Sequence, residues 1–256
     1  DLFRVVGGSD HAKFMHSHFG SLSTEGLSLN PGEDFGYETQ MRNFSVDPVA
    51  KPGWQADWKI EDRYGYLAGE RDIHLRYTDL TSEAEAHAAE AWVALRGYGG
   101  NETDWIPRLM VRRKGDRDLS STFAGVIEAY EDRSAISGIR RLGLEQSDGK
   151  ACSDSDVAVE IVLADGRKDL IVALDADNPN NLVHALVVQK DWDAHFEAQM
   201  CWVRKDANDS VERIVLCKGK SVQVGGHALI LKSETDFVEI RYEGEKPVVV
   251  AGVGEM

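Results

Sequence analysis

The sequence predicts an all-β protein built from antiparallel β-sandwich layers. Apolar residues recur at every second position through most of the 256 residues, which is the period of a pleated strand. Turn-forming combinations of glycine, proline and asparagine separate these segments. Helical periodicity is nearly absent between them, so consecutive strands are expected to pair directly with one another.

The segment 54–61, WQADWKIE, shows the alternation most clearly. Trp54, Ala56, Trp58 and Ile60 fall on one face of an extended chain, and polar residues fall on the other. This pattern is typical of a half-buried strand, so both tryptophans are predicted to lie in the core. The same reasoning predicts strands over 72–80, 108–114, 121–131, 156–165, 168–175, 184–189, 195–205, 211–219, 227–233, 236–244 and 246–252.

In the segment 83–96, EAEAHAAEAWVALR, composition and pattern disagree. The segment is rich in strong helix formers. Its apolar residues nevertheless alternate in two runs, 84–88 and 89–95, which are offset by one residue. A strand that contains a bulge produces such an offset, so a bulged strand is predicted here.

Polar and small residues interrupt the strand pattern at 146–155, QSDGKACSDS. This stretch predicts two domains: a β-sandwich domain over 1–148 and a smaller C-terminal antiparallel β domain over 149–256. The chain opens with DLFRVV, which has a strand pattern and no initiator methionine. We therefore expect the first domain to be incomplete at its N-terminus and the chain to be a piece of a longer protein.

The charge and cysteine content limit the partners. A net charge of -15 disfavours binding to nucleic acid, which depends on Lys and Arg neutralising phosphates. No apolar run approaches the ~20 residues of a membrane span, so none is predicted. The cysteines lie far apart, which indicates neither a zinc ribbon nor a disulfide framework. Cys201 and Cys217 sit in apolar strand patterns and are predicted core residues, and whether a pair forms a disulfide stays open.

Three histidines occur within the stretch HAKFMHSHFG. In a strand, His16 and His18 share a face with Ala12 and Phe14, whereas His11 points to the opposite face. Two imidazoles make His16 and His18 weak candidates for a metal site, because zinc requires a third protein ligand that the sequence does not position. The favoured interpretation is a hydrogen-bonded pair of half-buried histidines near the rim of a sheet.

Other candidate sites carry weaker signals. Exposed aromatic rings stack on sugars, which makes Tyr64 and Trp105 candidates for carbohydrate binding. The segment 175–181, DADNPNN, supplies oxygen ligands for calcium but lacks the glycine and terminal glutamate of a hand-type loop, so an ordinary turn is favoured. Since the short signatures of phosphate-binding loops, nucleophile elbows and zinc proteases are missing, the catalytic residues are unknown.

The sequence of about residues 1–145 resembles that of the C-terminal β portion of heparinase II/III-type polysaccharide lyases. The matching stretches are DLFRVVGGSDHAKFMHSHFG, GWQADWKIEDRYGY, DIHLRYTDL, WIPRLMVRRKG, STFAGVIEAYE and IRRLGLE. The resemblance implies an N-terminal α/α toroid packed against β-sandwich domains. It also implies β-elimination on uronic-acid polysaccharides, with a base at the C5 proton and an acid at the leaving oxygen, and a periplasmic or secreted location.

The sequence departs from that family in two respects, since neither the family's helical toroid nor its catalytic motifs are found in it. The family's W-H-x-H-x-D and S-H-N stretches are missing, and only the H-x-H part is imitated, by His16, Ser17 and His18. No cofactor is therefore expected in this chain, although zinc is possible in a full-length relative, and the chain alone is expected to be inactive. Its expected partners are an acidic polysaccharide or the toroid, and its expected substrate-binding residues are His11, His16, His18, Tyr64 and Trp105.

A second interpretation has the same predicted fold but no catalytic activity. The chain is then a non-catalytic carbohydrate-binding or cell-surface β module that uses exposed Trp and Tyr side chains. A third interpretation is a pure scaffold. Whether the chain is part of an enzyme stays open on the sequence alone.

Overall fold

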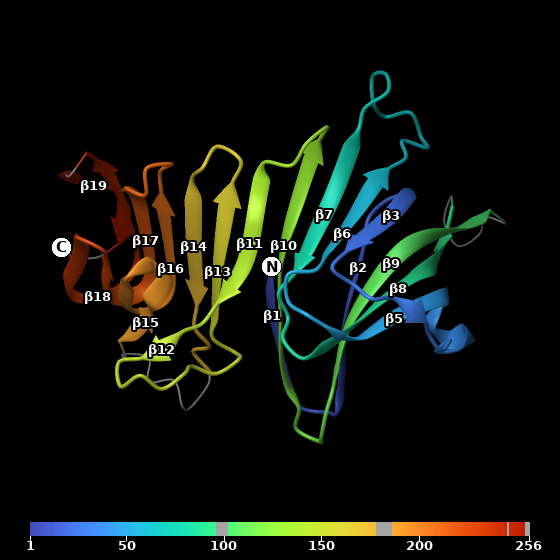
Figure 1. Ribbon diagram of the computed structural model, residues 1–256, viewed down its shortest axis with the longest axis horizontal. Helices are drawn as coiled ribbons and strands as arrows, with labels where there is room; N and C mark the ends of the chain where they lie inside the picture. The colour runs from blue at the N-terminus through green and yellow to red at the C-terminus, as the bar shows by residue number, and fades with distance from the viewer. Residues whose placement is uncertain (96–101, 178–185, 245, 254–256) are drawn as a thin grey trace. The chain divides into compact units, whose positions relative to one another are not determined.

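The computed structural model describes residues 1–95, 102–177, 186–244 and 246–253. The chain divides into two compact units, Asp1–Ser134 and Ala135–Met256. Both consist of antiparallel strands, and the described ranges contain no α-helix (Figure 1). The predicted all-β fold with antiparallel sandwich layers is therefore confirmed.

The first unit contains two five-stranded antiparallel sheets, called here the first sheet and the second sheet. The first sheet has the strand order β1 (Leu2–Val6), β10 (Ser120–Glu131), β7 (Ile73–Asp79), β6 (Gln55–Ile60) and β3 (Gly20–Glu25). The second sheet has the order β2 (Asp10–His16), β9 (Thr103–Lys114), β8 (Ala84–Ala94), β5 (Met41–Ala50) and β4 (Asn30–Pro31). A 3₁₀ turn (Tyr37–Thr39) precedes β5.

The core of the first unit lies between these two sheets. Trp58 on β6 is fully buried and packs in one cluster with Leu109 and Val111 of β9. Its indole Nε1 donates a hydrogen bond to the carbonyl oxygen of Pro107 at 3.2 Å, which ties the first sheet to the second. Trp54 is also buried, so the prediction that both tryptophans belong to the core is confirmed.

The segment 83–96 contains strand β8, as its alternation predicts, but the prediction of a bulge within it is wrong. The register between β8 and β9 is continuous, and the shifts occur between β8 and β5, where Asn43 of β5 has a φ of 57°. The two offset runs arise because both faces of β8 are covered. Ala84 and Ala86 face the inter-sheet core, and Ala89 and Ala91 join a cluster on the other face.

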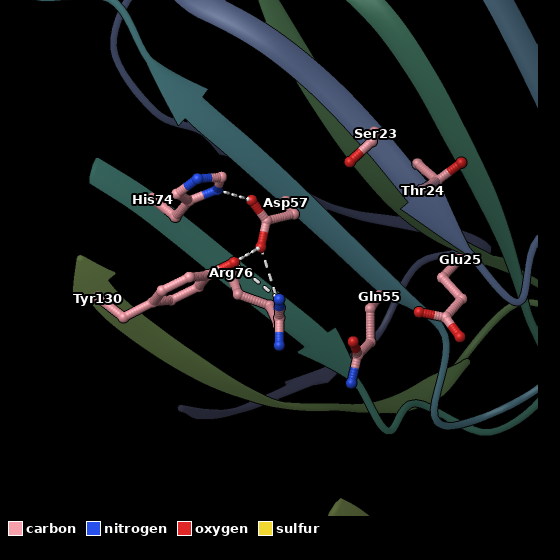
Figure 2. A pocket seen from close by; sticks show the side chains of 8 residues that line it. All are labelled: Ser23, Thr24, Glu25, Gln55, Asp57, His74, Arg76 and Tyr130. Atoms are coloured by element: carbon pink, nitrogen blue, oxygen red, sulfur yellow. Dashed lines mark hydrogen bonds and ion pairs between the residues drawn. The ribbon is translucent and has the colours of Figure 1, made fainter. Parts of the chain in front are cut away.

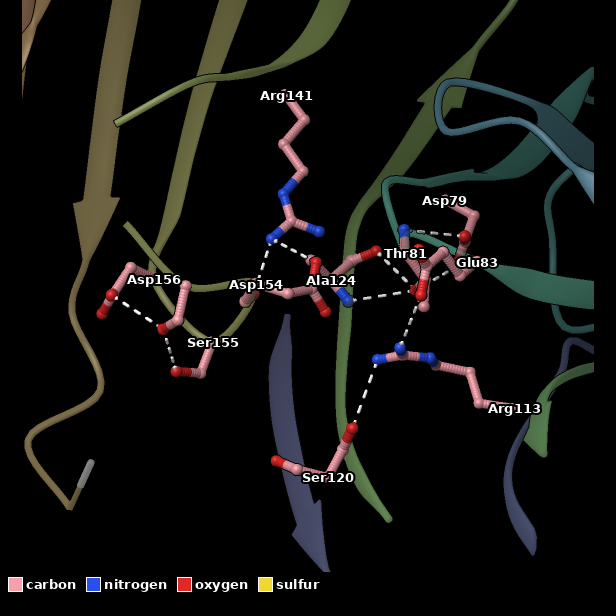
Figure 3. Close-up of polar contacts among 11 residues, drawn as sticks. Asp79, Thr81, Glu83, Arg113, Ser120, Ala124, Arg141, Asp154, Ser155 and Asp156 are labelled. Atoms are coloured by element: carbon pink, nitrogen blue, oxygen red, sulfur yellow. Dashed lines mark hydrogen bonds and ion pairs between the residues drawn. The ribbon is translucent and has the colours of Figure 1, made fainter. Parts of the chain in front are cut away.

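A carboxylate is buried in the first unit at the end of β7. Asp79 is 0% exposed and accepts a hydrogen bond from Tyr77 Oη at 2.5 Å. It also accepts from Thr81 N at 2.9 Å and from Thr81 Oγ1 at 3.1 Å (Figure 3). The Thr81 hydroxyl in turn accepts from Ala124 N at 3.2 Å. Burial raises the pKa of Asp79 despite these donors, because the charged form loses its water.

The second unit is a nine-stranded antiparallel sheet. Its main order is β11 (Ile136–Leu142), β13 (Val157–Leu163), β14 (Lys168–Ala173), β16 (Ala194–Lys205), β17 (Val211–Val224), β18 (His227–Glu243) and β19 (Lys246–Val253). Off this path, β12 (Glu145–Gln146) pairs with β15 (Val187–Gln189), which pairs with β16. A 3₁₀ turn (Lys190–Trp192) leads into β16.

The predicted seam at 146–155 lies inside this second unit. Strand β11 pairs with β13, which follows that stretch, so residues on both sides of it belong to one sheet. The guanidinium of Arg141 also forms an ion pair of 3.0 Å with Asp154 (Figure 3). The compact units accordingly divide at 134/135 rather than at 148/149.

One large apolar cluster forms the core of the second unit, and Cys201 belongs to it, as predicted. Cys217 is only half-buried. The structure holds all three cysteines as free thiols. Burial raises the pKa of Cys201 to about 12, so this thiol stays protonated and unreactive at neutral pH.

Candidate functional site

An open pocket of about 400 Å³ lies on the face of the first sheet that points away from the inter-sheet core. All of its lining side chains are polar (Figure 2). They come from strands β3, β6, β7 and β10 and are Ser23, Thr24, Glu25, Gln55, Asp57, His74, Arg76 and Tyr130. None of these eight was among the sequence candidates.

Strand register brings these residues together. Alternate residues of a strand share a face, and directly opposed residues on paired strands lie side by side. One row across the sheet consists of Ser23, Asp57, Arg76 and Glu128. The next row consists of Ser21, Lys59, His74 and Tyr130. A third row contributes the pair Glu25 and Gln55, so the pocket lies over three neighbouring cross-strand rows.

Asp57 is the centre of the pocket. Its Oδ1 lies 2.5 Å from Nδ1 of His74, and its Oδ2 accepts from Nε of Arg76 at 3.0 Å and from the Tyr130 hydroxyl at 2.5 Å (Figure 2). Nη2 of Arg76 donates to the same hydroxyl at 2.7 Å. The rings of His74 and Tyr130 are stacked, with 4.9 Å between centroids and 9° between planes. Four side chains from three strands thus hold one another in place.

The electrostatics of the pocket follow from this network. Burial acts to raise the pKa of Asp57, but hydrogen bonds from Tyr130, His74 and Arg76 outweigh it, and the pKa is lowered. Burial and the Asp57 carboxylate raise the pKa of Tyr130 to about 12. At neutral pH the pocket therefore presents a carboxylate, a guanidinium and a protonated phenol, which are suited to a ligand with carboxylate and hydroxyl groups.

We expect Asp57 to stabilise the fold in a pH-dependent way. Because its pKa is lower in the folded than in the unfolded chain, its contribution is present above the unfolded value of ~3.9 and is lost as the pH falls towards the folded value. Between about pH 5 and pH 3 the free energy of unfolding of the wild type should therefore fall more steeply than that of Asp57→Asn. Urea denaturation across this range measures both slopes.

The exposed Glu33 provides a control for this experiment, since Glu33→Gln removes a carboxylate outside the network. Its slope should match that of the wild type. Equal slopes for the wild type and Asp57→Asn would contradict the assigned role of Asp57.

A second surface, called here the aromatic shelf, is formed by His18, Phe19, Tyr64 and Tyr66. The rings of His18 and Tyr64 meet edge to face at 5.7 Å, and those of Tyr64 and Tyr66 lie 5.6 Å apart. Tyr64 is 50% exposed and Tyr66 80%. The loop that carries them is held by Asp62, whose carboxylate accepts from the backbone N–H groups of Tyr66 and Leu67.

Of the expected substrate-binding residues, the shelf brings His18 and Tyr64 into contact. Trp105 is linked to it indirectly: Arg63 stacks on Phe19 at 3.8 Å and forms an ion pair with Asp104, the residue before Trp105. The Trp105 ring itself is covered by the guanidinium of Arg42 at 4.0 Å.

The remaining two histidines lie elsewhere. His11 points into the sandwich and is 6% exposed. Its ring nitrogens are hydrogen-bonded to the Ser121 hydroxyl at 2.9 Å and to the Gly7 carbonyl at 2.5 Å. The imidazole is therefore not accessible to a substrate at the surface. His16 is exposed on the opposite face of β2 with Phe14, as the alternation predicts. The favoured interpretation, a hydrogen-bonded pair of half-buried histidines, is wrong in burial, because His16 and His18 are both exposed.

The metal candidates gain no further ligands. Within the described residues, no group of three or more His, Cys, Asp or Glu side chains is placed to hold a metal ion, around His16 and His18 or elsewhere. Residues 178–181 of the calcium candidate 175–181 lie outside the described residues.

No model of a known protein family and no curated protein matches this chain. In the ranges that the structure describes, no helix has the length and apolar character needed to cross a bilayer.

Proposed function

We propose that this chain is the β-sandwich portion of a heparinase II/III-type polysaccharide lyase and that its pocket binds a uronate unit of an acidic polysaccharide. The observation that carries the proposal is the pocket network, in which Arg76 and a protonated Tyr130 stand beside the Asp57–His74 pair. The resemblance of residues 1–145 to that family supports the same ligand class.

The chemistry of the pocket fits a uronate. A guanidinium matches a carboxylate in charge and geometry, and Arg76 retains 26% side-chain exposure. Sugar hydroxyls have donors and acceptors in Ser23, Glu25 and Gln55 along the same pocket. Because the chain carries a net charge of -15, a polyanion is held only where a cation is presented locally, which favours a pocket over a broad surface.

The proposal includes binding without cleavage by this chain alone. Elimination requires a base and an acid positioned on either side of the bond that breaks. The open pocket carries Tyr130 as a proton donor, but the family's W-H-x-H-x-D and S-H-N stretches are missing from the sequence.

Titration calorimetry with a mannuronate oligosaccharide tests this function. Arg76→Gln is expected to weaken binding about tenfold, because it removes a charge-assisted hydrogen bond to the ligand. The matched control is Arg117→Gln, which changes an exposed arginine in the turn between β9 and β10. Equal affinities for the wild type and Arg76→Gln would refute the pocket assignment. Release of unsaturated product, seen by ultraviolet absorbance, would refute binding without cleavage.

A freestanding carbohydrate-binding module is the second candidate, and the aromatic shelf favours it. Tyr66 is 80% exposed on a loop that Asp62 holds in place, which is how a rigid stacking platform for sugar rings is built. This candidate predicts binding of a neutral glucan that depends on Tyr66 and not on Arg76. The same calorimetry with a neutral glucan therefore separates the two functions.

A further inference from the structure

The outer face of the second sheet carries an arginine in an unusual position. On β9, Arg108 lies directly opposite His16 of the neighbouring strand β2 and opposite the small Ala89 of β8. Phe14, two residues before His16, is 50% exposed, and its ring lies 5.7 Å from the Arg108 guanidinium. These side chains belong to the face of the second sheet that points away from the inter-sheet core, because Leu109 and Val111 point inward.

Arg108 has no anionic partner in the part of the chain that the structure describes. Its Nε is buried without a hydrogen-bond partner. Burial lowers the pKa of Arg108, and no neighbouring carboxylate acts against it. Arg112 gives a direct comparison on the same face of the same strand: its Nε and Nη2 donate to Asp10 at 2.8 and 2.5 Å, and its pKa is raised.

A half-buried cation without a counter-charge destabilises a folded protein, because the charge loses hydration and gains no pairing in return. In a chain of net charge -15, carboxylates are abundant, yet none pairs with Arg108 among the described residues. A carboxylate supplied by a ligand satisfies this requirement.

We infer that Arg108, with Phe14 and His16, forms a second site that binds the carboxylate of an acidic saccharide. The identity of the ligand rests on the proposed function. The site itself is separate from the pocket, because the inter-sheet core lies between the outer faces of the two sheets.

The geometry defines how the ligand is held. Nε is the only Arg108 nitrogen that is both covered and unpartnered, so the terminal amino groups reach the surface. There they donate two parallel hydrogen bonds to a carboxylate that approaches end-on. The exposed Phe14 ring packs against the sugar body. His16 lies directly opposite Arg108 across the β2–β9 pair, and its Nδ1 is bonded to the Ser17 carbonyl at 3.1 Å, so Nε2 is the nitrogen that it can offer to the same ligand.

Calorimetry with the mannuronate oligosaccharide distinguishes this site from the pocket. The wild type should show two binding sites. Arg76→Gln should weaken the pocket about tenfold and leave the second site unchanged, whereas Arg108→Gln should weaken the second site at least about tenfold and leave the pocket unchanged. If Arg108→Gln leaves every binding event unchanged, the inference is overturned whatever happens at the pocket. If Arg76→Gln has no effect but Arg108→Gln abolishes binding, the proposed pocket fails and the second site stands.

Thermal unfolding supplies an independent readout. Arg108→Met should raise the melting temperature by about 2 °C, because an apolar side chain of similar length replaces an unpaired charge. The matched variant Arg112→Met should give no such rise, since it breaks the pair with Asp10. A fall in melting temperature for Arg108→Met as large as that for Arg112→Met would show that Arg108 has a structural role and would overturn the inference.

Discussion

Trp58→Ala is expected to lower the free energy of unfolding of the first unit by about 4 kcal/mol. The side chain is 0% exposed, so its removal leaves a cavity between the sheets and forfeits the apolar contacts that fill it. The change also removes the hydrogen bond from Nε1 to Pro107, which leaves that carbonyl without this partner. Urea denaturation followed by circular dichroism measures the loss.

Two controls separate packing from the hydrogen bond. Trp58→Phe keeps most of the ring volume and loses the donor, so it should cost roughly 1–2 kcal/mol. Trp105→Ala removes the same side chain from a half-buried position beside Arg42 and should cost clearly less than Trp58→Ala. Similar costs for the two alanine variants would show that Trp58 does not anchor the core.

The second large effect is expected at the buried carboxylate. Asp79→Ala should cost about 3 kcal/mol, because Tyr77 Oη, Thr81 N and Thr81 Oγ1 all lose an acceptor inside the core. The same denaturation experiment measures it. Thr81→Ser is the matched control, since it keeps the hydroxyl that bonds to Asp79 and to Ala124 N, and it should cost much less.

Asp79 also predicts a pH trend opposite to that of Asp57. Its pKa is raised in the folded chain, so its stabilising contribution is fully present below the unfolded pKa of ~3.9 and is lost as the pH rises through the folded pKa. Asp79→Asn, which cannot ionise, should therefore lose less stability than the wild type as the pH rises above ~4. Parallel pH profiles for the two proteins would contradict a raised pKa.

The strands could be predicted from the sequence because alternation reports directly on burial. In the segment 72–80, His74 and Arg76 alternate with the apolar Leu75 and Tyr77, and the structure places a strand there. The segment 83–96 shows the limit of this reasoning. The alternation of apolar residues indicates that one face of a strand is buried. It does not distinguish a strand with a bulge from a strand that is buried on both faces.

The pocket could not be predicted because it depends on which strands become neighbours. Asp57 lies 17 positions from His74 and 73 from Tyr130 in the sequence, and only the pairing of β6 with β7 and of β7 with β10 brings them together. The polar side of 54–61 and of 72–80 was visible as a pattern. What joins them is the long-range register, which local periodicity does not encode.

The alanines on both faces of β8 have a consequence for the second sheet. A methyl group projects little from the backbone, so the side-chain layers above and below this strand approach its main chain closely. The room that a larger residue would occupy is already taken by neighbours such as Trp58 on one side and Phe44 on the other. Substitution of these alanines by larger residues is therefore disfavoured on both faces of β8, since added bulk at adjacent positions pushes the layers on opposite sides of the strand apart.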